Sequence, residues 1–321
     1  MKQHLHSYVW KCVVLAFITL ITYLPSYSQY YGEKSSFFEA GITMGPSNFL
    51  GDLGGNKGIG RHGLKDNNFP LTKFMGGIWL TYQPNEWLAF RLALNIGRLE
   101  GDDAIIKPKG GYEEARLIRN SDFRSPLKEA FLAAEIYPTV FFEYDPTDIF
   151  HKLRPYGLIG IGVFNFKPQG TDPATGQFVD LQPLHTEGQG FPEYPDRKEY
   201  KLTQLNVPTG IGVKYFLSES VNLSLEVVHR TTFTDYIDDV STTYIDPALF
   251  YTHLPLAQAQ VAERLANKSL GPGGLGTRFV PGDKRGTAEN NDAYYSFGFK
   301  VGFRLGSGNR WSNSTRCPVR F

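Results

Sequence analysis

Acidic residues crowd one histidine in the stretch "HRTTFTDYIDD" (229–239), and the groups there and nearby that could do chemistry are His185, His229, Asp235, Asp238, Asp239 and His253. Hydrolysis needs a nucleophile or an activated water together with a base and an orienting group. No serine stands in a nucleophile-elbow context, and no His-Glu-x-x-His spacing occurs. The acids could hold calcium, but they lack the regular alternate-position oxygen spacing of a calcium loop. We therefore predict a protein that is not an enzyme and has no metal or cofactor.

A second set of charged residues needs a specific element to position it. In "YYSFGFKVGFRL" (294–305) the apolar residues Tyr295, Phe297, Phe299, Val301, Phe303 and Leu305 fill alternate positions, and Lys300 and Arg304 lie between them. A helix would scatter these residues, whereas a strand places the apolar set on one face and the charged set on the other. The stretch is predicted to be a strand.

The N-terminus indicates where such a strand is used. Lys2 and Lys11 precede the apolar run "CVVLAFITLITYL" (12–24), and small residues follow before Gln29. This pattern is typical of a cleaved export signal, predicted here as residues 1–28, and the run is shorter than the roughly 20 residues of a spanning helix. The alternative is an anchor that stays attached.

Composition excludes several classes of protein. Loss of Lys2 and Lys11 would lower the basic count from 33 to 31, against 32 acidic residues, which leaves no broad basic field for nucleic acid. The mature chain keeps one cysteine, Cys317, so an internal disulfide is excluded. After residue 28 no apolar run could form a transmembrane helix. An exported chain of this kind can cross a membrane only as a closed barrel.

Alternating segments occur at about 36–44, 72–83, 87–98, 128–142, 154–166, 203–216, 221–232 and 293–305. The connections near 84–86, 145–153 and 217–220 are short, and those at about 45–71, 99–127, 167–202 and 233–292 are long. An even strand number with short turns at one end and long loops at the other is typical of outer-membrane barrels. The predicted fold is all-β, an eight-stranded antiparallel transmembrane barrel (29–306) with long extracellular loops, short periplasmic turns and a periplasmic tail (307–321).

On this model the charged face lines the lumen. The predicted lumen ion network comprises Glu39, Arg91, Glu129, Glu135, Lys214, Glu226, Arg230, Lys300 and Arg304. A register slip of one residue would turn these groups toward lipid, at about 2–4 kcal/mol for each Lys or Arg near the midplane. Eight strands enclose only enough space for side chains, so glycines such as Gly210 and Gly212 are expected to make room for the long ones. The lumen is predicted to be plugged by ion pairs, with a narrow conduction path as the alternative.

The long loops hold over a third of the mature chain. "LPLAQAQVAERLANK" (254–268) predicts a helix with an apolar stripe of Leu254, Ala257, Val261 and Leu265. The third loop is rich in proline and glycine, which favours turns over extended pairing.

Several longer runs carry a resemblance to a known family: "GDLGG" (51–55), "FFEYD" (141–145), "RPYGLIGIGVFNFKPQ" (154–169), "LQPLHTEGQG" (181–190), "PTGIGVKY" (208–215), "RTTFTDYIDDVSTTYID" (230–246) and "RCPVRF" (316–321). Their order and spacing resemble the PorG family of outer-membrane barrels from the type IX secretion apparatus. This sequence departs from the family pattern at Asp145 and Val319.

The resemblance implies a non-enzymatic part of the machine that exports proteins with a C-terminal sorting domain and often supports gliding. It implies contact with a periplasmic ring of PorK-like and PorN-like proteins, and with a PorM-like motor component. On the barrel topology, the surfaces within reach of the ring are Phe142, Glu143, Tyr144, Asp145, Trp311, Cys317 and Phe321. The alternatives are an OmpA-like structural or adhesive barrel, whose outer loops would matter most, and a narrow channel.

Overall fold

The structure is a computed structural model that describes residues 36–54, 69–106, 113–142, 149–218, 220–269 and 279–305. The predicted export signal (1–28) and the predicted tail (307–321) lie outside these residues.

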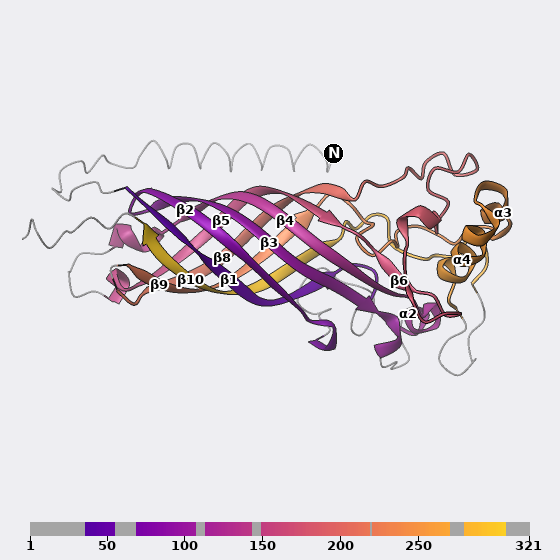
Figure 1. Ribbon diagram of the computed structural model, residues 1–321, viewed down its shortest axis with the longest axis horizontal. Helices are drawn as coiled ribbons and strands as arrows, with labels where there is room; N and C mark the ends of the chain where they lie inside the picture. Colours follow the sequence, from indigo (N-terminus) through magenta and orange to yellow (C-terminus); the bar gives the residue numbers. More distant parts are fainter. Residues whose placement is uncertain are drawn as a thin grey trace, which may run out of the picture. The chain divides into compact units, whose positions relative to one another are not determined.

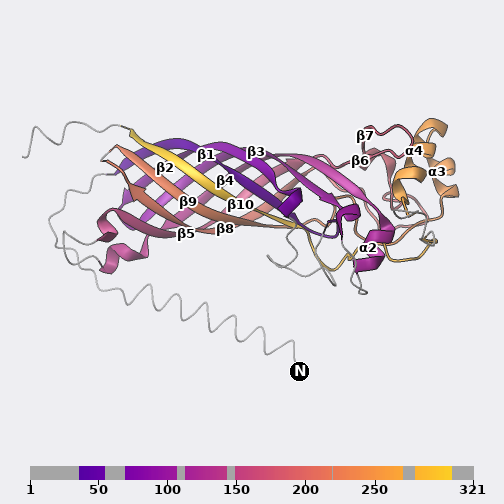
Figure 2. The same cartoon turned by 90° about the horizontal axis from the view of Figure 1, so that it is seen from below.

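Long antiparallel strands form the body of the protein: β1 (Phe37–Leu50), β2 (Lys73–Asn85), β3 (Leu88–Asp102), β4 (Asp122–Ile136), β5 (Leu153–Phe166), β8 (Thr203–Phe216), β9 (Val221–Thr232) and β10 (Ala293–Leu305). Each pairs with the strands before and after it in this series, and β10 pairs with β1, so the sheet closes on itself (Figures 1 and 2). The predicted eight-stranded antiparallel barrel is confirmed.

The connections alternate in length, as expected. Residues 86–87, 137–152 and 217–220 make the short turns, and residues 51–72, 103–121, 167–202 and 233–292 make the long connections. Because the strands are antiparallel neighbours, all short turns lie at one end of the barrel and all long connections at the other.

Outward-facing side chains form an apolar belt around the barrel. In β3, Phe90, Leu92, Leu94 and Ile96 are between 44% and 68% exposed, whereas Arg91 between them is buried. Other strands contribute Phe38, Ile42, Ile78, Leu80, Leu132, Ile159, Ile161, Leu205, Ile211, Leu225, Phe297, Phe299 and Phe303. Strands of 12 to 15 residues exceed the roughly 9–11 that a bilayer requires, so their ends extend past the belt.

The bounds of the fourth strand were predicted wrongly. The segment expected at 128–142 is β4 at Asp122–Ile136, followed by the 3-10 helix η4 (Pro138–Phe142). Pro126 is tolerated because β4 pairs with β3 through this point, while its pairing with β5 begins only at Leu127. A proline whose backbone nitrogen faces the side of a strand without a paired neighbour removes no hydrogen bond between strands. Pro138 then ends the strand, since the residue before a proline favours a break.

The prediction that Tyr295 is exposed on the apolar face is also wrong. It has the outward parity of β10 but is only 2% exposed, because it packs edge-on against Phe297 and its hydroxyl accepts a hydrogen bond from Asn48 Nδ2 at 3.1 Å. Asn48 belongs to the part of β1 beyond the predicted end at residue 44. Because β1 extends to Leu50, its residue Asn48 pairs with Tyr295 and helps to cover that side chain.

Aromatic side chains fill much of the lumen, and glycines make room for them. A Cβ at Gly212 would lie 2.5 Å from the ring of Tyr156, and a Cβ at Gly302 would lie 2.6 Å from the ring of Trp79. Trp79 packs with Ala93, Phe131 and other buried apolar residues. Gly212 and Gly302 therefore accommodate rings, whereas Gly298 leaves room for the charged side chain of Glu226, whose Cγ would lie 3.1 Å from a Cβ there.

The long connections fold into a head, defined here as residues 167–202, 233–269 and 279–292. It contains β6 (Gln169–Thr171), β7 (Phe178–Asp180), the 3-10 helix η6 (Gln182–Leu184), α3 (Ala248–His253) and α4 (Leu256–Ala266). The 3-10 helices η2 (Phe69–Leu71) and η3 (Asp103–Ile105), with α2 (Glu113–Arg119), lie in the first two long connections. Among the helices of the described segments, none is long and apolar enough to cross a membrane.

The helix predicted at 254–268 is present as α4, with α3 before it and Pro255 between them. Proline fixes its own φ and lacks the donor that a continuous helix would use, so the two helices are separate. The buried face of α4 is Ala259, Ala262, Leu265 and Ala266, so the predicted stripe is wrong at Ala257, which is exposed.

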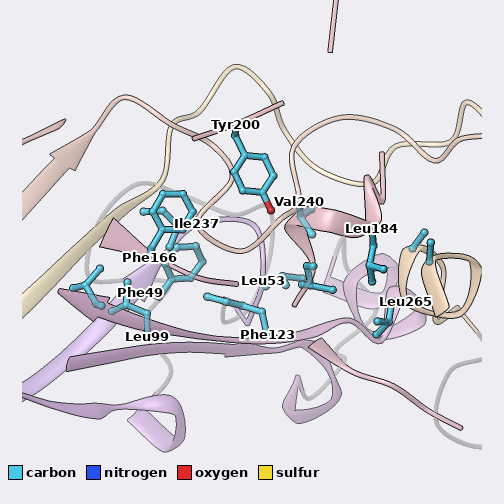
Figure 3. Packing of buried hydrophobic residues seen from close by; sticks show 14 of the residues in the cluster. Phe49, Leu53, Leu99, Phe123, Phe166, Leu184, Tyr200, Ile237, Val240 and Leu265 are labelled. Carbon is cyan, nitrogen blue, oxygen red and sulfur yellow. The ribbon is translucent and has the colours of Figure 1, made fainter. Parts of the chain in front are cut away.

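One hydrophobic core joins the barrel to the head (Figure 3). It begins with barrel residues Phe49, Leu99, Phe123 and Phe166 and continues into Leu184, Tyr200, Ile237, Val240 and Leu265 of the head. The rings of Phe166, Tyr200 and Tyr236 stack in series across this boundary, with centroids 6.2 Å and 4.8 Å apart. The head therefore packs directly on the rim rather than hanging from flexible loops.

Candidate functional site

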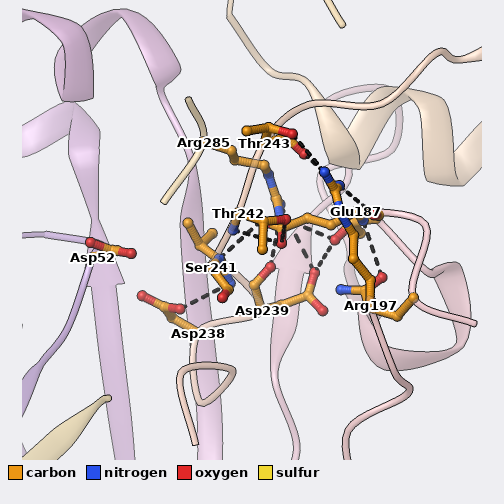
Figure 4. Close-up of polar contacts among 12 residues, drawn as sticks. Asp52, Glu187, Arg197, Asp238, Asp239, Ser241, Thr242, Thr243 and Arg285 are labelled. Carbon is orange, nitrogen blue, oxygen red and sulfur yellow. Dashed lines mark hydrogen bonds and ion pairs between the residues drawn. The ribbon is translucent and has the colours of Figure 1, made fainter. Parts of the chain in front are cut away.

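A buried carboxylate organises the centre of the head. Glu187 accepts hydrogen bonds from the backbone N–H groups of Ser241 and Thr242, both at 2.9 Å, from the Thr242 hydroxyl at 2.6 Å and from Arg285 Nη1 at 2.8 Å. Figure 4 shows these groups, all from the fourth long connection, converging on Glu187 of the third. The single side chain therefore joins the third long connection to the fourth.

Arg285 extends this network. Besides Glu187, it donates to the Asp239 carbonyl oxygen at 2.6 Å and to the Thr186 hydroxyl at 3.2 Å. The Asp239 carboxylate accepts from Thr186 at 2.5 Å and from the Tyr200 hydroxyl at 2.6 Å. Burial raises the pKa of Asp239 to about 6, and the Arg285 guanidinium opposes that rise. The network fixes backbone geometry, because most of its acceptors and donors are saturated.

A second buried pair ties the head to the other connections. Arg119 of α2 donates from Nε to Asp103 at 2.7 Å, and its other nitrogens donate to the carbonyl oxygens of Arg285 and Asp52, both at 2.6 Å. Four long connections thus meet through two arginines, and the barrel rim and the head form one hydrogen-bonded unit.

Three other buried aspartates, Asp235, Asp238 and Asp292, lie beside this network with the half-buried Asp52. Burial, followed by the neighbouring Asp238 and Asp52 carboxylates, raises the pKa of Asp235 to about 9. Burial also raises the pKa of Asp238 and of Asp292 well above the usual range. In Figure 4, Asp238 and Asp239 point to opposite sides, Asp239 toward Arg285 and Asp238 toward the side of Asp52. The acidic stretch Asp235, Asp238 and Asp239 is therefore buried.

The histidines do not join these acids. His185 Nδ1 lies 2.6 Å from the Gln189 carbonyl oxygen, and His253 Nε2 lies 2.9 Å from Glu193. His229 lies in β9 opposite Tyr295 of β10. Within the described ranges, no group of three or more His, Cys, Asp or Glu side chains is arranged as a ready-made metal centre. The geometry therefore offers no general base facing a nucleophile among these residues.

The charged residues predicted for the lumen lie inside the barrel. Arg91 pairs with Glu135, and with Glu226 at 2.8 Å; Lys214 pairs with Glu39 at 2.8 Å, and Arg230 with Glu129 at 3.2 Å. Lys300 lies 3.5 Å from Glu226 and 3.9 Å from Glu135. Arg304 differs from the others, since it lies at the end of β10 with its guanidinium over the ring of Phe37.

Hydroxyl and amide groups complete this lumen network. Glu226 accepts from the Tyr156 hydroxyl at 2.7 Å, Glu135 accepts from the Tyr137 hydroxyl, and Glu129 accepts from Asn95, Asn206 and Tyr294. Beside Trp79 and Arg230, the lumen keeps a cavity of about 20 Å³, which is room for about one water molecule. Side chains thus fill the barrel interior at this level.

The predicted ring-binding surface is described only in part. Phe142 ends η4 on a short turn and is 64% exposed, and Phe141 and Ile149 nearby are also exposed. The other residues predicted for this surface, Glu143, Tyr144, Asp145, Trp311, Cys317 and Phe321, lie outside the described residues.

Sequence reasoning missed several members of the head network: Asp52, Asp103, Arg119, Glu187, Arg285 and Asp292. Charged residues in polar loops carry no periodic signal, so their burial was not visible. The runs quoted for the family resemblance do contain Asp52 and Glu187, within "GDLGG" and "LQPLHTEGQG". Those runs hold buried residues of the head rather than only surface groups.

No protein-family model matches the chain, and no curated protein matches it. Among solved structures, it is similar to Ail, the attachment invasion locus protein of Yersinia pestis, with 8% identity over 84% of this chain and 99% of that one and a TM-score of 0.34. The outer membrane protein W of E. coli (13% identity, 85% and 100% covered, TM-score 0.32) and OprG of Pseudomonas aeruginosa (12%, 87% and 100%, 0.31) are also similar. Such low scores carry no argument, and the fold rests on the strand pairing itself.

Proposed function

We propose that the protein is a non-enzymatic barrel of a Gram-negative outer membrane that holds a rigid head beyond the bilayer, in a structural or adhesive role. The apolar belt and the closed sheet support the membrane location, because only a closed sheet leaves no backbone group unsatisfied in lipid. The observation that carries the role is the single core shared by rim and head. A surface held in this way can bind a partner without the entropic cost of ordering loops.

The orientation can be tested by labelling cysteines on intact cells. Lys198 is exposed in the head and Lys152 is exposed on a short turn. In a Cys317→Ser background, Lys198→Cys should react with a membrane-impermeant maleimide at least ten times faster than Lys152→Cys. Both should react equally once the outer membrane is permeabilised. Labelling of residue 152 alone on intact cells would reverse the proposed topology.

A narrower role is supported by the opposite end. As a second candidate, the barrel is a PorG-like component of the type IX secretion machinery that contacts a PorK-like and PorN-like ring. The supporting observation is the exposed apolar group Phe141, Phe142 and Ile149 on a short turn. Aromatic residues are also common where a barrel meets the membrane–water interface. The exposure of these side chains therefore supports partner binding only if their replacement weakens association with the ring proteins.

Phe142→Ala should reduce co-purification of the ring proteins at least tenfold while the barrel still inserts, because the exposed ring supplies contact area to a partner. Phe303→Ala is the matched control, since Phe303 is an exposed phenylalanine of the belt. Export of a C-terminally sorted cargo should fall with the first variant and not with the second. Unchanged ring association and normal export in Phe142→Ala would remove the secretion role and leave the head as the functional surface.

A further inference from the structure

Cations gather on one outward face of the barrel, at the end that carries the head. Arg98 of β3 and Lys128 of β4 have the outward parity of their strands and are exposed, as are Lys167 after β5 and Lys201 before β8. Arg124 of β4 is half-buried on the same face. We call these residues the basic group. At the same end of β1, β9 and β10, none of the outward-facing residues that the structure describes is Lys or Arg.

The register of β3 and β4 brings the first members of the basic group together. Arg98 pairs with Pro126, which lies between Arg124 and Lys128 on the outward face of β4. Both cations of β4 are therefore diagonal neighbours of Arg98. Diagonal neighbours in a sheet are about 7–8 Å apart, a distance that long side chains can span. Three cations thus surround one exposed proline.

Lys167 and Lys201 extend the basic group across the next two strands. The backbone N–H of Lys167 donates to the Ser125 hydroxyl at 2.9 Å, so Lys167 lies beside the same part of β4. The N–H of Phe166 donates to the Leu202 carbonyl oxygen at 3.0 Å, so Lys201 lies next along the barrel wall. The basic group therefore forms a row from β3 to β8 at one level of the barrel.

Carboxylates balance only part of this charge. Among the described residues, those within ion-pair distance of the basic group are Glu100, 3.7 Å from Arg98, and Asp180, 2.6 Å from Lys167. Lys128, near the centre, has no ion-pair partner in the described part of the chain. Like charges on neighbouring strands repel one another, so an anion bound among these side chains would relieve the repulsion.

The basic group lies at the edge of the apolar belt. The segment of β4 from Ile136 back to Lys128 has nine residues, within the roughly 9–11 that a tilted strand uses to cross a bilayer. Ile96, Leu132 and Ile161 of the belt, which are 68%, 53% and 71% exposed, follow on β3, β4 and β5 toward the middle of the barrel. Lipid headgroups lie at this level, and Lys and Arg side chains near the ends of membrane segments extend to it.

We propose that the basic group binds the phosphate-bearing headgroup of a membrane lipid, with Lys128 at the centre of the site. Phosphate oxygens accept charge-assisted hydrogen bonds from Lys and Arg, and an arginine can offer two parallel donors. The acyl chains of the same lipid would lie along Ile96, Leu132 and Ile161, whereas a free phosphate ion would make no such contact. The site rests on the membrane location proposed above and goes beyond it, because it names a ligand of the barrel wall.

The test compares two lipids that differ only in the phosphate. Phosphatidic acid and diacylglycerol with the same acyl chains are titrated into the purified full chain in detergent micelles, and native mass spectrometry measures the fraction of protein with bound lipid. Phosphatidic acid should bind at least about tenfold more tightly, since several basic residues act on one phosphate. Excess inorganic phosphate should not displace it, because the ion lacks the acyl chains.

A charge reversal tests the central residue. Lys128→Glu should weaken the binding of phosphatidic acid at least about tenfold, because a repelling charge replaces the central cation. Lys198→Glu is the matched control, since Lys198 is an exposed lysine of the head outside the basic group, and its affinity should stay within about twofold of the wild type. Electrophoretic mobility before and after heating checks that both variants are folded barrels.

Equal affinity of the wild-type chain for phosphatidic acid and diacylglycerol would overturn the site. Displacement of the lipid by inorganic phosphate would also overturn it and assign the cations to a free anion. Unchanged binding in folded Lys128→Glu is the third contrary result. The first two use the wild-type chain, so the proposal can fail even if the variant does not fold. The cysteine labelling of intact cells tests the membrane location separately, so the two proposals can fail independently.

Discussion

Replacing Arg91 with methionine should destabilise the barrel by about 3–5 kcal/mol, because two carboxylates would stay buried without their guanidinium. Arg91 pairs with both Glu135 and Glu226 inside the lumen, and among the described residues Lys300 would remain within ion-pair distance of them, at 3.9 Å and 3.5 Å. Urea unfolding of the variant in detergent micelles, followed by tryptophan fluorescence and by electrophoretic mobility, measures the loss.

Arg98→Met is the matched control, because Arg98 lies on the same strand with 52% of its side chain exposed and pairs with Glu100 at 3.7 Å. Its loss should cost less than about 1 kcal/mol. Combining Arg91→Met with Glu135→Gln and Glu226→Gln should restore most of the stability, since no charge is then left without a partner. Equal stability of Arg91→Met and Arg98→Met would mean that lumen charge pairing does not hold the barrel.

The barrel could be predicted because alternation is local. The alternation of neighbouring residues alone predicts that Phe297, Phe299 and Phe303 face outward, and all three are exposed in the structure. The sequence also placed Lys214 and Glu39 inward, but they are 175 residues apart, so only the closed sheet decides that they pair. The bounds of β4 were predicted wrongly because a proline can lie within a strand, as Pro126 does, or follow its end, as Pro138 does.

The head could not be predicted in the same way. Its contacts join residues far apart, such as Arg119 with Arg285 over 166 positions, and its segments have neither a period of two nor a period of 3.6. The sequence showed Asp235, Asp238 and Asp239 only as an acidic run near a histidine. The structure separates them: Asp239 faces a buried arginine, while Asp235 and Asp238 face other acids. That difference depends on tertiary packing alone.

Replacing Glu187 with alanine should unfold the head locally while the barrel stays closed. The change removes the acceptor of two backbone N–H groups and one hydroxyl, and it leaves the Arg285 guanidinium buried beside Asp239, 3.9 Å away. Breaking a buried pair by removing one partner costs about 3–5 kcal/mol. Hydrogen exchange at the Ser241 and Thr242 amides should rise at least a hundredfold, which is about 2.7 kcal/mol of lost protection. Exchange in β2 and β3 should stay unchanged.

Glu199→Ala is the control for this effect, since Glu199 is an exposed acid of the same long connection. Glu187→Met with Arg285→Met should lose less stability than Glu187→Met alone, because the double change removes both buried charges together. If Glu187→Ala instead opened the barrel strands and the head to the same extent, the rim and head would unfold as one cooperative unit. The shared core of Phe123, Phe166 and Ile237 would then dominate over the polar network, and the head would be no more than an extension of the barrel.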